Sequence, residues 1–210
     1  MTIDTLPRFT AADFRRRAAV HQLPREQNVY GDHRLNPDLA SLFVHDQLRD
    51  AAVLVPVVDR AGEASVILTQ RAAKLRSHSG EIAFPGGRLD PTDPTPEYAA
   101  LRETEEEIGL NSDFIEVVGR LPDYVTGSGF RIVPVLSVVK PDFMLTINED
   151  EVADAFEVPL SFLMDPANHV RGSRIWNNRE RFFYRMPFGE RNIWGVTAGI
   201  IRVVYERLYA

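Results

Sequence analysis

Three glutamates recur at a helical spacing near the middle of the chain. Glu103, Glu106 and Glu107 occupy positions i, i+3 and i+4, so on a helix their carboxylates share one face. Such like-charged neighbours each destabilise an isolated helix by about 0.2–0.5 kcal/mol, and a bound cation would offset that repulsion. Carboxylate oxygens suit hard divalent cations such as Mg²⁺ and Mn²⁺. An acidic run is more often a solvated helix face, so the spacing alone does not establish a metal site.

The neighbouring residues favour the metal-site interpretation. Arg102 directly precedes Glu103, where its guanidinium can orient or neutralise a carboxylate. Upstream, Phe84–Gly87 (FPGG) predicts a strand end followed by two glycines, and glycine lets backbone carbonyls approach a ligand closely. We therefore expect the three glutamates and the carbonyl of Gly87 to be the metal ligands.

Residue chemistry also bounds the helix that must position these glutamates. The prolines upstream bar regular helix, because each lacks an amide donor and restricts the residue before it. Pro96 fits the first helical position with Thr95 as its N-cap. Gly109 supplies the stop after Ile108. The spacing therefore predicts a short helix over Pro96–Ile108.

Two ordered motifs in this part of the chain resemble one enzyme family. Residues 102–110 (RETEEEIGL) are similar to the second half of the Nudix box. The preceding segment resembles an additional signature of the coenzyme A diphosphatase branch of the Nudix superfamily. Two signatures joined in order are far more specific than one short motif. The signature residues are Ile67–Ala72, Arg76, Gly80 and Phe84–Gly87.

The first half of the box departs from the superfamily pattern. Counting from Gly87, the sixth residue is Asp93 rather than glutamate, and Arg102 comes one residue late. Thr104 stands where an apolar residue is usual. For these reasons neither Asp93 nor Glu97 is expected to be a metal ligand.

The resemblance implies a fold and a reaction. The fold is of the α/β class, a Nudix-type α/β/α sandwich around a central mixed β-sheet. Residues 51–210 would form the Nudix hydrolase domain, and residues 1–50 an N-terminal helical extension packed on it. The reaction would be Mg²⁺- or Mn²⁺-dependent hydrolysis of the diphosphate bond of coenzyme A or its derivatives. Its products would be phosphopantetheine and adenosine 3′,5′-bisphosphate.

The resemblance also implies residues that bind the substrate. Arg71 and Arg76 would recognise the diphosphate, because a guanidinium pairs its donors with phosphate oxygens. Gly86 and Gly87 would line the same site. Surface arginines that pair with carboxylates remain the alternative for both cations.

The general base is left open between two glutamates. Glu103, oriented by Arg102, is one choice. The other is Glu151, at the end of an acidic loop before a predicted strand, with Glu149 behind it. Nudix enzymes often supply a further glutamate from such a loop.

Three other functions compete with coenzyme A hydrolysis. One is a Nudix hydrolase of another nucleoside diphosphate derivative, such as ADP-ribose, a dinucleoside polyphosphate or a nucleoside triphosphate. Another is a non-catalytic Nudix module that binds a nucleotide, although such modules tend to lose acids from the box. A third is an acidic helix with a purely structural purpose, which would leave stability indifferent to Mg²⁺.

Composition bounds the partners and the compartment. A net charge of −6 argues against a nucleic-acid partner, and no apolar run is long enough to span a bilayer. The absence of cysteine and of an apolar secretory start predicts a cytoplasmic protein. The expected partner is a small-molecule nucleoside diphosphate substrate, and a homodimer is left open.

Hydrophobic periodicity and turn residues predict the remaining elements. Trp176 and Trp194 are expected in the core, Pro56 at a sheet edge or bulge, His78 exposed, and residues 126–130 in a tight strand connection. The predicted helices are 11–20 (capped by Thr10), 39–48, 159–164 and 195–208; the predicted strands are 52–58 paired with 65–69, 114–119, 132–139, and 169–176 paired with 181–186.

Overall fold

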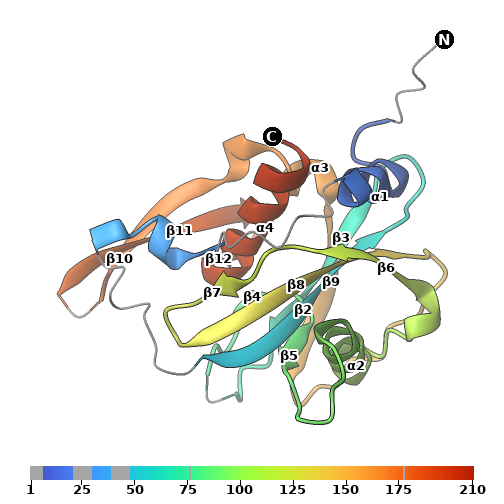
Figure 1. Ribbon diagram of the computed structural model, residues 1–210, viewed down its shortest axis with the longest axis horizontal. Coiled ribbons are helices and arrows are strands. Elements are labelled where there is room, and N and C mark those ends of the chain that lie inside the picture. The colour runs from blue at the N-terminus through green and yellow to red at the C-terminus, as the bar shows by residue number, and fades with distance from the viewer. Residues whose placement is uncertain (1–6, 21–29, 39–47, 76, 177) are drawn as a thin grey trace.

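The computed structural model describes residues 7–20, 30–38, 48–75, 77–176 and 178–210 (Figure 1). The predicted helix over 39–48 lies outside them except for its last residue, and so does Arg76. In chain order the elements are α1 (Ala11–Val20), β1 (Tyr30–Gly31), η1 (Asp32–Arg34), β2 (Arg49–Val58), β3 (Ser65–Arg71), β4 (Ile82–Ala83), β5 (Gly86–Arg88), α2 (Pro96–Ile108), η3 (Ser112–Phe114), β6 (Ile115–Arg120), β7 (Tyr124–Val125), β8 (Phe130–Val139), β9 (Val152–Pro159), α3 (Leu160–Leu163), η4 (Pro166–Asn168), β10 (Val170–Trp176), β11 (Arg179–Phe188), β12 (Arg191–Trp194) and α4 (Gly195–Leu208).

A mixed sheet forms the centre of the molecule. Strands β2 and β8 run parallel through an unbroken register from Arg49–Phe130 to Val58–Val139. Both are long apolar runs, as expected of strands covered on both faces. The order across the sheet is β1-β7-β8-β2-β3-β4, with β5 on β2, β6 on β8 and β9 on β3. Strands β10, β11 and β12 form a separate antiparallel sheet.

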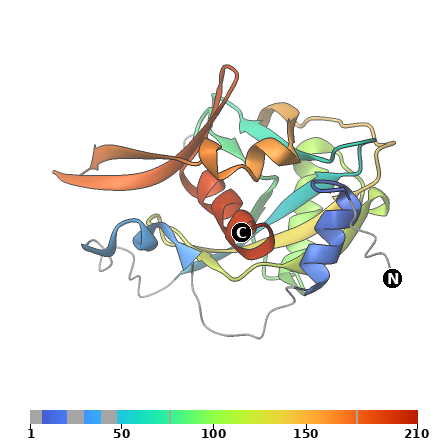
Figure 2. The same cartoon turned by 90° about the horizontal axis from the view of Figure 1, so that it is seen from above.

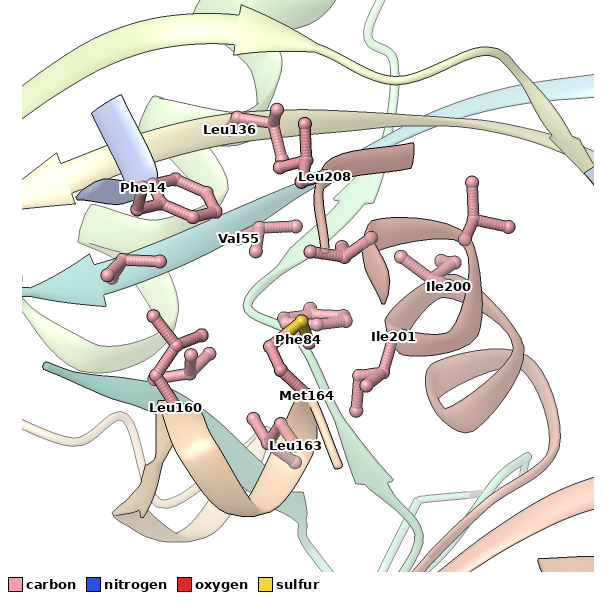
Figure 3. Close-up of a cluster of buried hydrophobic side chains, with 14 of the residues drawn as sticks. Phe14, Val55, Phe84, Leu136, Leu160, Leu163, Met164, Ile200, Ile201 and Leu208 are labelled. Atoms are coloured by element: carbon pink, nitrogen blue, oxygen red, sulfur yellow. The ribbon is translucent and has the colours of Figure 1, made fainter. Parts of the chain in front are cut away.

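Alternating side chains of the central strands build a core on each face of the sheet. Val55 and Val57 of β2 pack into a cluster with residues of α1, α3 and α4 (Figure 3). Ala52 and Leu54 pack instead against Ala99 and other residues of α2. Because the side chains of a strand alternate with period two, one strand serves both cores. The mixed sheet is thus flanked by helices, which confirms the predicted α/β/α fold class.

Helix α2 has the predicted ends. Thr95 accepts a hydrogen bond from the backbone N–H of Tyr98 at 3.2 Å, and Pro96 is the first helical residue. Gly109 ends the helix with φ 67°, a left-handed conformation that favours glycine. Thr104 and Ile108 of this helix are fully buried.

The predicted strands and the helices over 11–20, 159–164 and 195–208 are present with shifts of a few residues at their ends. Residues 126–130 form the predicted tight connection, closed by a hydrogen bond from Thr126 N–H to the Phe130 carbonyl. The predicted exposure of His78 is also confirmed, because its side chain is 53% accessible. Strand β12 was not predicted from the sequence.

The prediction that Pro56 marks an edge or bulge is wrong, because β2 lies inside the sheet. The N–H of Leu54 points away from β8 and donates to the Pro85 carbonyl, and position 56 faces the same way. On that side β5 pairs with residues 51–53 and β3 with 57–58. Pro56 falls in the gap between them, so its missing N–H costs no ladder bond.

The prediction that Trp176 belongs to the core is also wrong. Its residue is 49% exposed, at the tip of the β10–β11 hairpin, whereas Trp194 is half-buried. Figure 2 shows this hairpin projecting from the body of the molecule. Because this end of the hairpin extends away from the body of the molecule, the Trp176 ring has few neighbours. The local sequence does not show where a hairpin leaves the body.

The N-terminal residues pack on the main sheet rather than standing apart. Phe14 of α1 is fully buried in the larger core, and Arg15 pairs with Glu116 of β6 at 2.7 Å. Strand β2 begins at Arg49, two residues before the predicted domain start. Among the described residues no helix is long and apolar enough to cross a membrane.

Candidate active site

Helix α2 presents its glutamates along a gradient from the core to the solvent. The side chain of Glu107 is 4% exposed, that of Glu103 17% and that of Glu106 55%. The spacing therefore places them on one side of the helix, as predicted, but only Glu106 is openly solvated. A buried glutamate requires compensating partners.

Glu107 lies between strand β3 and the glycine corner, which is formed by Gly86 and Gly87. Its Oε2 accepts a hydrogen bond from Gly86 N–H at 3.2 Å, and its Oε1 is 3.9 Å from the guanidinium of Arg71. Burial, with smaller contributions from the charges of Glu103 and Glu151, raises the pKa of Glu107 to about 7. The contacts with Gly86 and Arg71 act in the opposite direction. The site therefore holds more negative charge than its own partners neutralise.

Glu103 lies directly against the backbone of Gly87. A Cβ at position 87 would collide with the carboxylate of Glu103, so only glycine permits this approach. Burial raises the pKa of Glu103, although the hydrogen bond from Arg102 lowers it. The paired glycines thus serve close packing of a carboxylate on the corner, in addition to any carbonyl contact.

Arg102 connects three acidic side chains of this site, one from the turn before α2 and two from α2 itself. Its guanidinium donates to Asp93 at 2.8 and 3.0 Å, to Glu103 at 3.0 Å and to Glu106 at 2.9 Å. The hydrogen bond to Asp93, followed by those to the glutamates, raises the pKa of Arg102. The same bond lowers the pKa of Asp93, whose side chain is only 1% exposed. Asp93 is therefore a positioning partner of Arg102, a contact that the sequence did not predict.

A signal for Asp93 was present in the sequence. It is the sixth residue after Gly87, where the Nudix box has its first acid. The extra residue before Arg102 obscured the match. The structure nevertheless brings the Asp93 carboxylate to the Arg102 guanidinium at 2.8 Å.

The loop before β9 brings Glu151 to the same site. Its backbone carbonyl accepts from Ala72 N–H at 2.8 Å, and its carboxylate accepts from the Asn148 amide at 3.3 Å. Its charge raises the pKa of both Glu103 and Glu107. Glu149 is exposed on the same loop. The geometry thus supports Glu151 over Glu149 as the further acid.

Arg71 ends strand β3 beside these acids. Its side chain is 29% exposed, and within the described part of the chain its buried Nε has no hydrogen-bond partner. The other predicted arginine, Arg76, lies outside the described residues. Of the two arginines predicted to recognise the diphosphate, Arg71 is therefore the one that the structure describes beside the acids.

The donor set fits a hard divalent cation. The largely buried carboxylates of Glu107 and Glu103 lie against Gly86 and Gly87, their charges repel each other, and oxygen ligands suit Mg²⁺ or Mn²⁺. Among the residues described, however, no three acidic or histidine side chains converge into a ready-made site. The guanidinium of Arg102 lies between Glu103 and Glu106 and holds both. Arg102 bonds one oxygen of each carboxylate, so the second oxygen of each remains for a cation.

The chain is similar to known proteins over much of its length. The sequence profile of the NUDIX domain matches residues 48–178. The chain belongs to the Nudix family. A protein of Cronobacter sakazakii, described as an uncharacterized Nudix hydrolase NudL, is 42% identical over 162 residues, which cover 73% of this chain and 80% of that protein. The Escherichia coli K12 protein of the same description is 40% identical over the same shares.

Solved Nudix structures are similar to this chain at lower identity. A Caenorhabditis elegans Ap4A hydrolase complex is 23% identical and superposes with a TM-score of 0.45, covering 54% of this chain and 82% of that one. The Nudix hydrolase RenU from M. smegmatis is 24% identical with a TM-score of 0.46, covering 56% of this chain and 74% of that one. The Nudix family assignment confirms the predicted enzyme class, a hydrolase that acts on phosphorus-containing acid anhydrides.

Proposed function

We propose that this Nudix hydrolase cleaves the diphosphate bond of coenzyme A or one of its derivatives with the help of Mg²⁺ or Mn²⁺. The observation that carries the proposal is the position of Arg71 and Glu107. The arginine of the coenzyme A-type signature lies 3.9 Å from the buried glutamate of the Nudix box. Two motifs distant in sequence therefore contribute to one site.

The metal would be held by Glu103, Glu106, Glu107 and the carbonyl of Gly87. When bound, it would supply positive charge to the diphosphate oxygens and lower the pKa of the attacking water. These ligands include the three glutamates whose mutual repulsion a cation offsets. The close approach of Glu103 to Gly87 supports a shared role of helix and corner.

The protein's own groups would bind the substrate and move the proton. Arg71 would hold the diphosphate, supported by the backbone of Gly86. Glu151 or Glu103 would accept the proton of the attacking water. Glu103 is already oriented by Arg102, whereas the carboxylate of Glu151 accepts only a 3.3 Å bond from the Asn148 amide. Comparing Glu103→Gln with Glu151→Gln across pH would identify the base.

The test is product analysis with coenzyme A, Mg²⁺ and Mn²⁺. We expect phosphopantetheine and adenosine 3′,5′-bisphosphate, and we expect Glu107→Gln to reduce kcat/KM by at least about a hundredfold while keeping the fold. Glu106→Gln should act in the same direction. Glu105→Gln is the matched control, because this exposed glutamate lies on the same helix and its side chain accepts from Asn111 rather than contacting the site. Normal turnover by Glu107→Gln would reject the site.

The same assay separates the competing functions. Faster turnover of ADP-ribose, a dinucleoside polyphosphate or a nucleoside triphosphate would contradict coenzyme A as substrate while leaving the hydrolase intact. Binding of nucleotide without turnover of any substrate would indicate a non-catalytic module. A cytoplasmic location and a homodimer stay predictions.

A further inference from the structure

A cavity of about 220 Å³ lies along one face of the β10–β11 hairpin, from its tip to the start of α4. The hairpin, the start of α4, the turn Thr126–Ser128 and the segment around Glu81 line it. None of its lining residues is a glutamate of α2. Figures 1 and 2 show the hairpin leaving the body beside α4, with residues 30–36 next to it. The profile match ends at residue 178, so β11 and α4 lie beyond it.

The hairpin turns one face toward this cavity. Arg174 is paired in register with Arg181, and Gly172 with Phe183. Because alternate residues of a strand share a side, Trp176 lies on the same face as Arg174. All four hairpin residues that line the cavity therefore come from one face: Arg174, Trp176, Arg181 and Phe183.

Aromatic rings form the apolar part of the lining. Phe183 and Trp194 meet edge to face with centroids 5.4 Å apart. Trp176 is 49% exposed, and the guanidinium of Arg181 lies 5.9 Å from its ring. An exposed indole beside a guanidinium is a stacking platform, because every nucleobase offers a flat π-face. Because the Trp176 ring is not buried in the core, a nucleobase can stack on it.

Among the described charged side chains that line the cavity, Arg174 is the cation without an acidic partner. Asp32 pairs with Arg181 at 2.6 Å and accepts from the Tyr124 hydroxyl at 2.7 Å. Glu81 is bonded to His78 at 2.8 Å. Arg174 makes no ion pair within the described residues and lies directly opposite another arginine. Like charges at opposed positions destabilise a sheet, and a bound anion would offset this.

We propose that this cavity binds the phosphorylated nucleoside half of the substrate, with the base stacked on Trp176 and a phosphomonoester held by Arg174. This inference rests on the proposed function, which identifies the rest of the substrate as the phosphopantetheine half of coenzyme A. The volume is below the roughly 300–1,000 Å³ of pockets for whole small ligands, so it suits part of one.

A short backbone path joins the cavity to the glutamates. Arg71 N–H donates to the carbonyl of Glu81 at 2.9 Å, and the Arg71 guanidinium approaches Glu107. Glu81 lines the cavity. Glu81 and Arg71 are thus neighbours across two paired segments, so a ligand that extended from the cavity past Glu81 would approach Arg71, where the diphosphate is proposed to bind.

Tryptophan fluorescence tests this site directly. The chain has two tryptophans, and both line the cavity. With metal removed by EDTA, we expect adenosine 3′,5′-bisphosphate to quench the emission saturably, and adenosine or inorganic phosphate alone to bind at least about tenfold more weakly. The absence of quenching by the bisphosphate at millimolar concentration would overturn the proposal.

Matched variants separate the two contacts. Arg174→Gln should weaken bisphosphate binding by on the order of tenfold and leave adenosine binding unchanged. Arg171→Gln is the control, because this exposed arginine of β10 lies on the opposite face, over the Phe182 ring at 3.9 Å. Trp176→Ala should weaken the binding of both the bisphosphate and adenosine. The fluorescence of Trp194 then reports the binding. Equal effects of the two arginine variants would overturn the proposal.

Turnover distinguishes this inference from the proposed function. If Arg174→Gln raises KM for coenzyme A and Arg171→Gln does not, both proposals hold. If no diphosphate is cleaved but the bisphosphate still binds through Arg174, the cavity stands and the diphosphatase proposal fails. If coenzyme A is cleaved with an unchanged KM by Arg174→Gln, the cavity proposal alone fails.

Discussion

At the residue scale, Arg102 determines how the acids of α2 are arranged. It holds Glu103 and Glu106 on one side and Asp93 on the other, through hydrogen bonds of 2.8–3.0 Å. Three carboxylates around one guanidinium leave a net negative charge. The guanidinium therefore fixes the geometry of the acids without cancelling their attraction for a cation.

Asp93 tests this positioning role. We expect Asp93→Asn to lower kcat by about 10–100-fold, as is typical when a partner behind a metal ligand is removed. The reason is that Arg102 would lose its charged anchor and no longer orient Glu103. Glu97→Gln is the control, since Glu97 lies on α2 with Arg102 but pairs with Arg120 at 3.6 Å. Equal activity of Asp93→Asn and wild type would show that Arg102 orients Glu103 without help.

The sequence predicted the site residues on α2 better than those around it. A helix repeats every 3.6 residues, so spacing alone placed the glutamates on one side. The partnership of Asp93 with Arg102 depends on the path of a proline-containing turn, which spacing does not give. The cavity residues Trp176 and Arg181 depend on where the hairpin leaves the sheet, a long-range property.

At the element scale, the ends of α2 position the glutamates relative to the glycine corner. We expect Thr95→Ala to lower the free energy of unfolding by about 1 kcal/mol, because Tyr98 N–H loses its capping acceptor. Gly109→Ala should lower it as well, because φ is 67° and an added Cβ would crowd Thr146 at 2.9 Å. Urea unfolding measures both. An unchanged midpoint for both variants would show that the caps contribute nothing.

Helix α1 depends on a buried carboxylate. Burial alone would raise the pKa of Asp13, but hydrogen bonds from Arg17 and Arg16 outweigh it and hold the pKa below 3.8. A lowered folded-state pKa stabilises the fold above pH 3.8, and this stability is lost as pH falls through the folded value. We expect Asp13→Asn to be less stable than wild type at pH 7 and the difference to shrink below pH 3.8. A constant difference in urea titrations would contradict this.

Local chemistry explains which elements could be predicted. Helices α1 and α2 carry their own caps, and β2 and β8 are long apolar runs, so each was identified without knowledge of its neighbours. Strand β12 is only four residues long, and its pairing with β11 supplies what its sequence lacks. The interior position of Pro56 depends on the gap between two other strands, which no local pattern encodes.

At the scale of the whole molecule, metal binding should stabilise the fold. A ligand that binds only the native state adds about 2.7 kcal/mol at a hundred times its Kd, enough to raise Tm by several degrees. We expect Mg²⁺ or Mn²⁺ to raise Tm of wild type and of Glu105→Gln, EDTA to reverse the rise, and Glu107→Gln to abolish it. The same Tm with metal and with chelator would favour a purely structural acidic helix. The division of the chain at residue 50 stays a prediction.

Asn36 has a consequence for association between molecules. Its side chain donates to the Phe182 carbonyl at 2.9 Å and accepts from Phe182 N–H at 2.8 Å, as a neighbouring strand would. Strand β12 covers β11 only from Arg185 to Phe188. One amide therefore occupies a backbone edge that a strand of another molecule would otherwise extend, and its loss would open this hairpin to edge-to-edge aggregation.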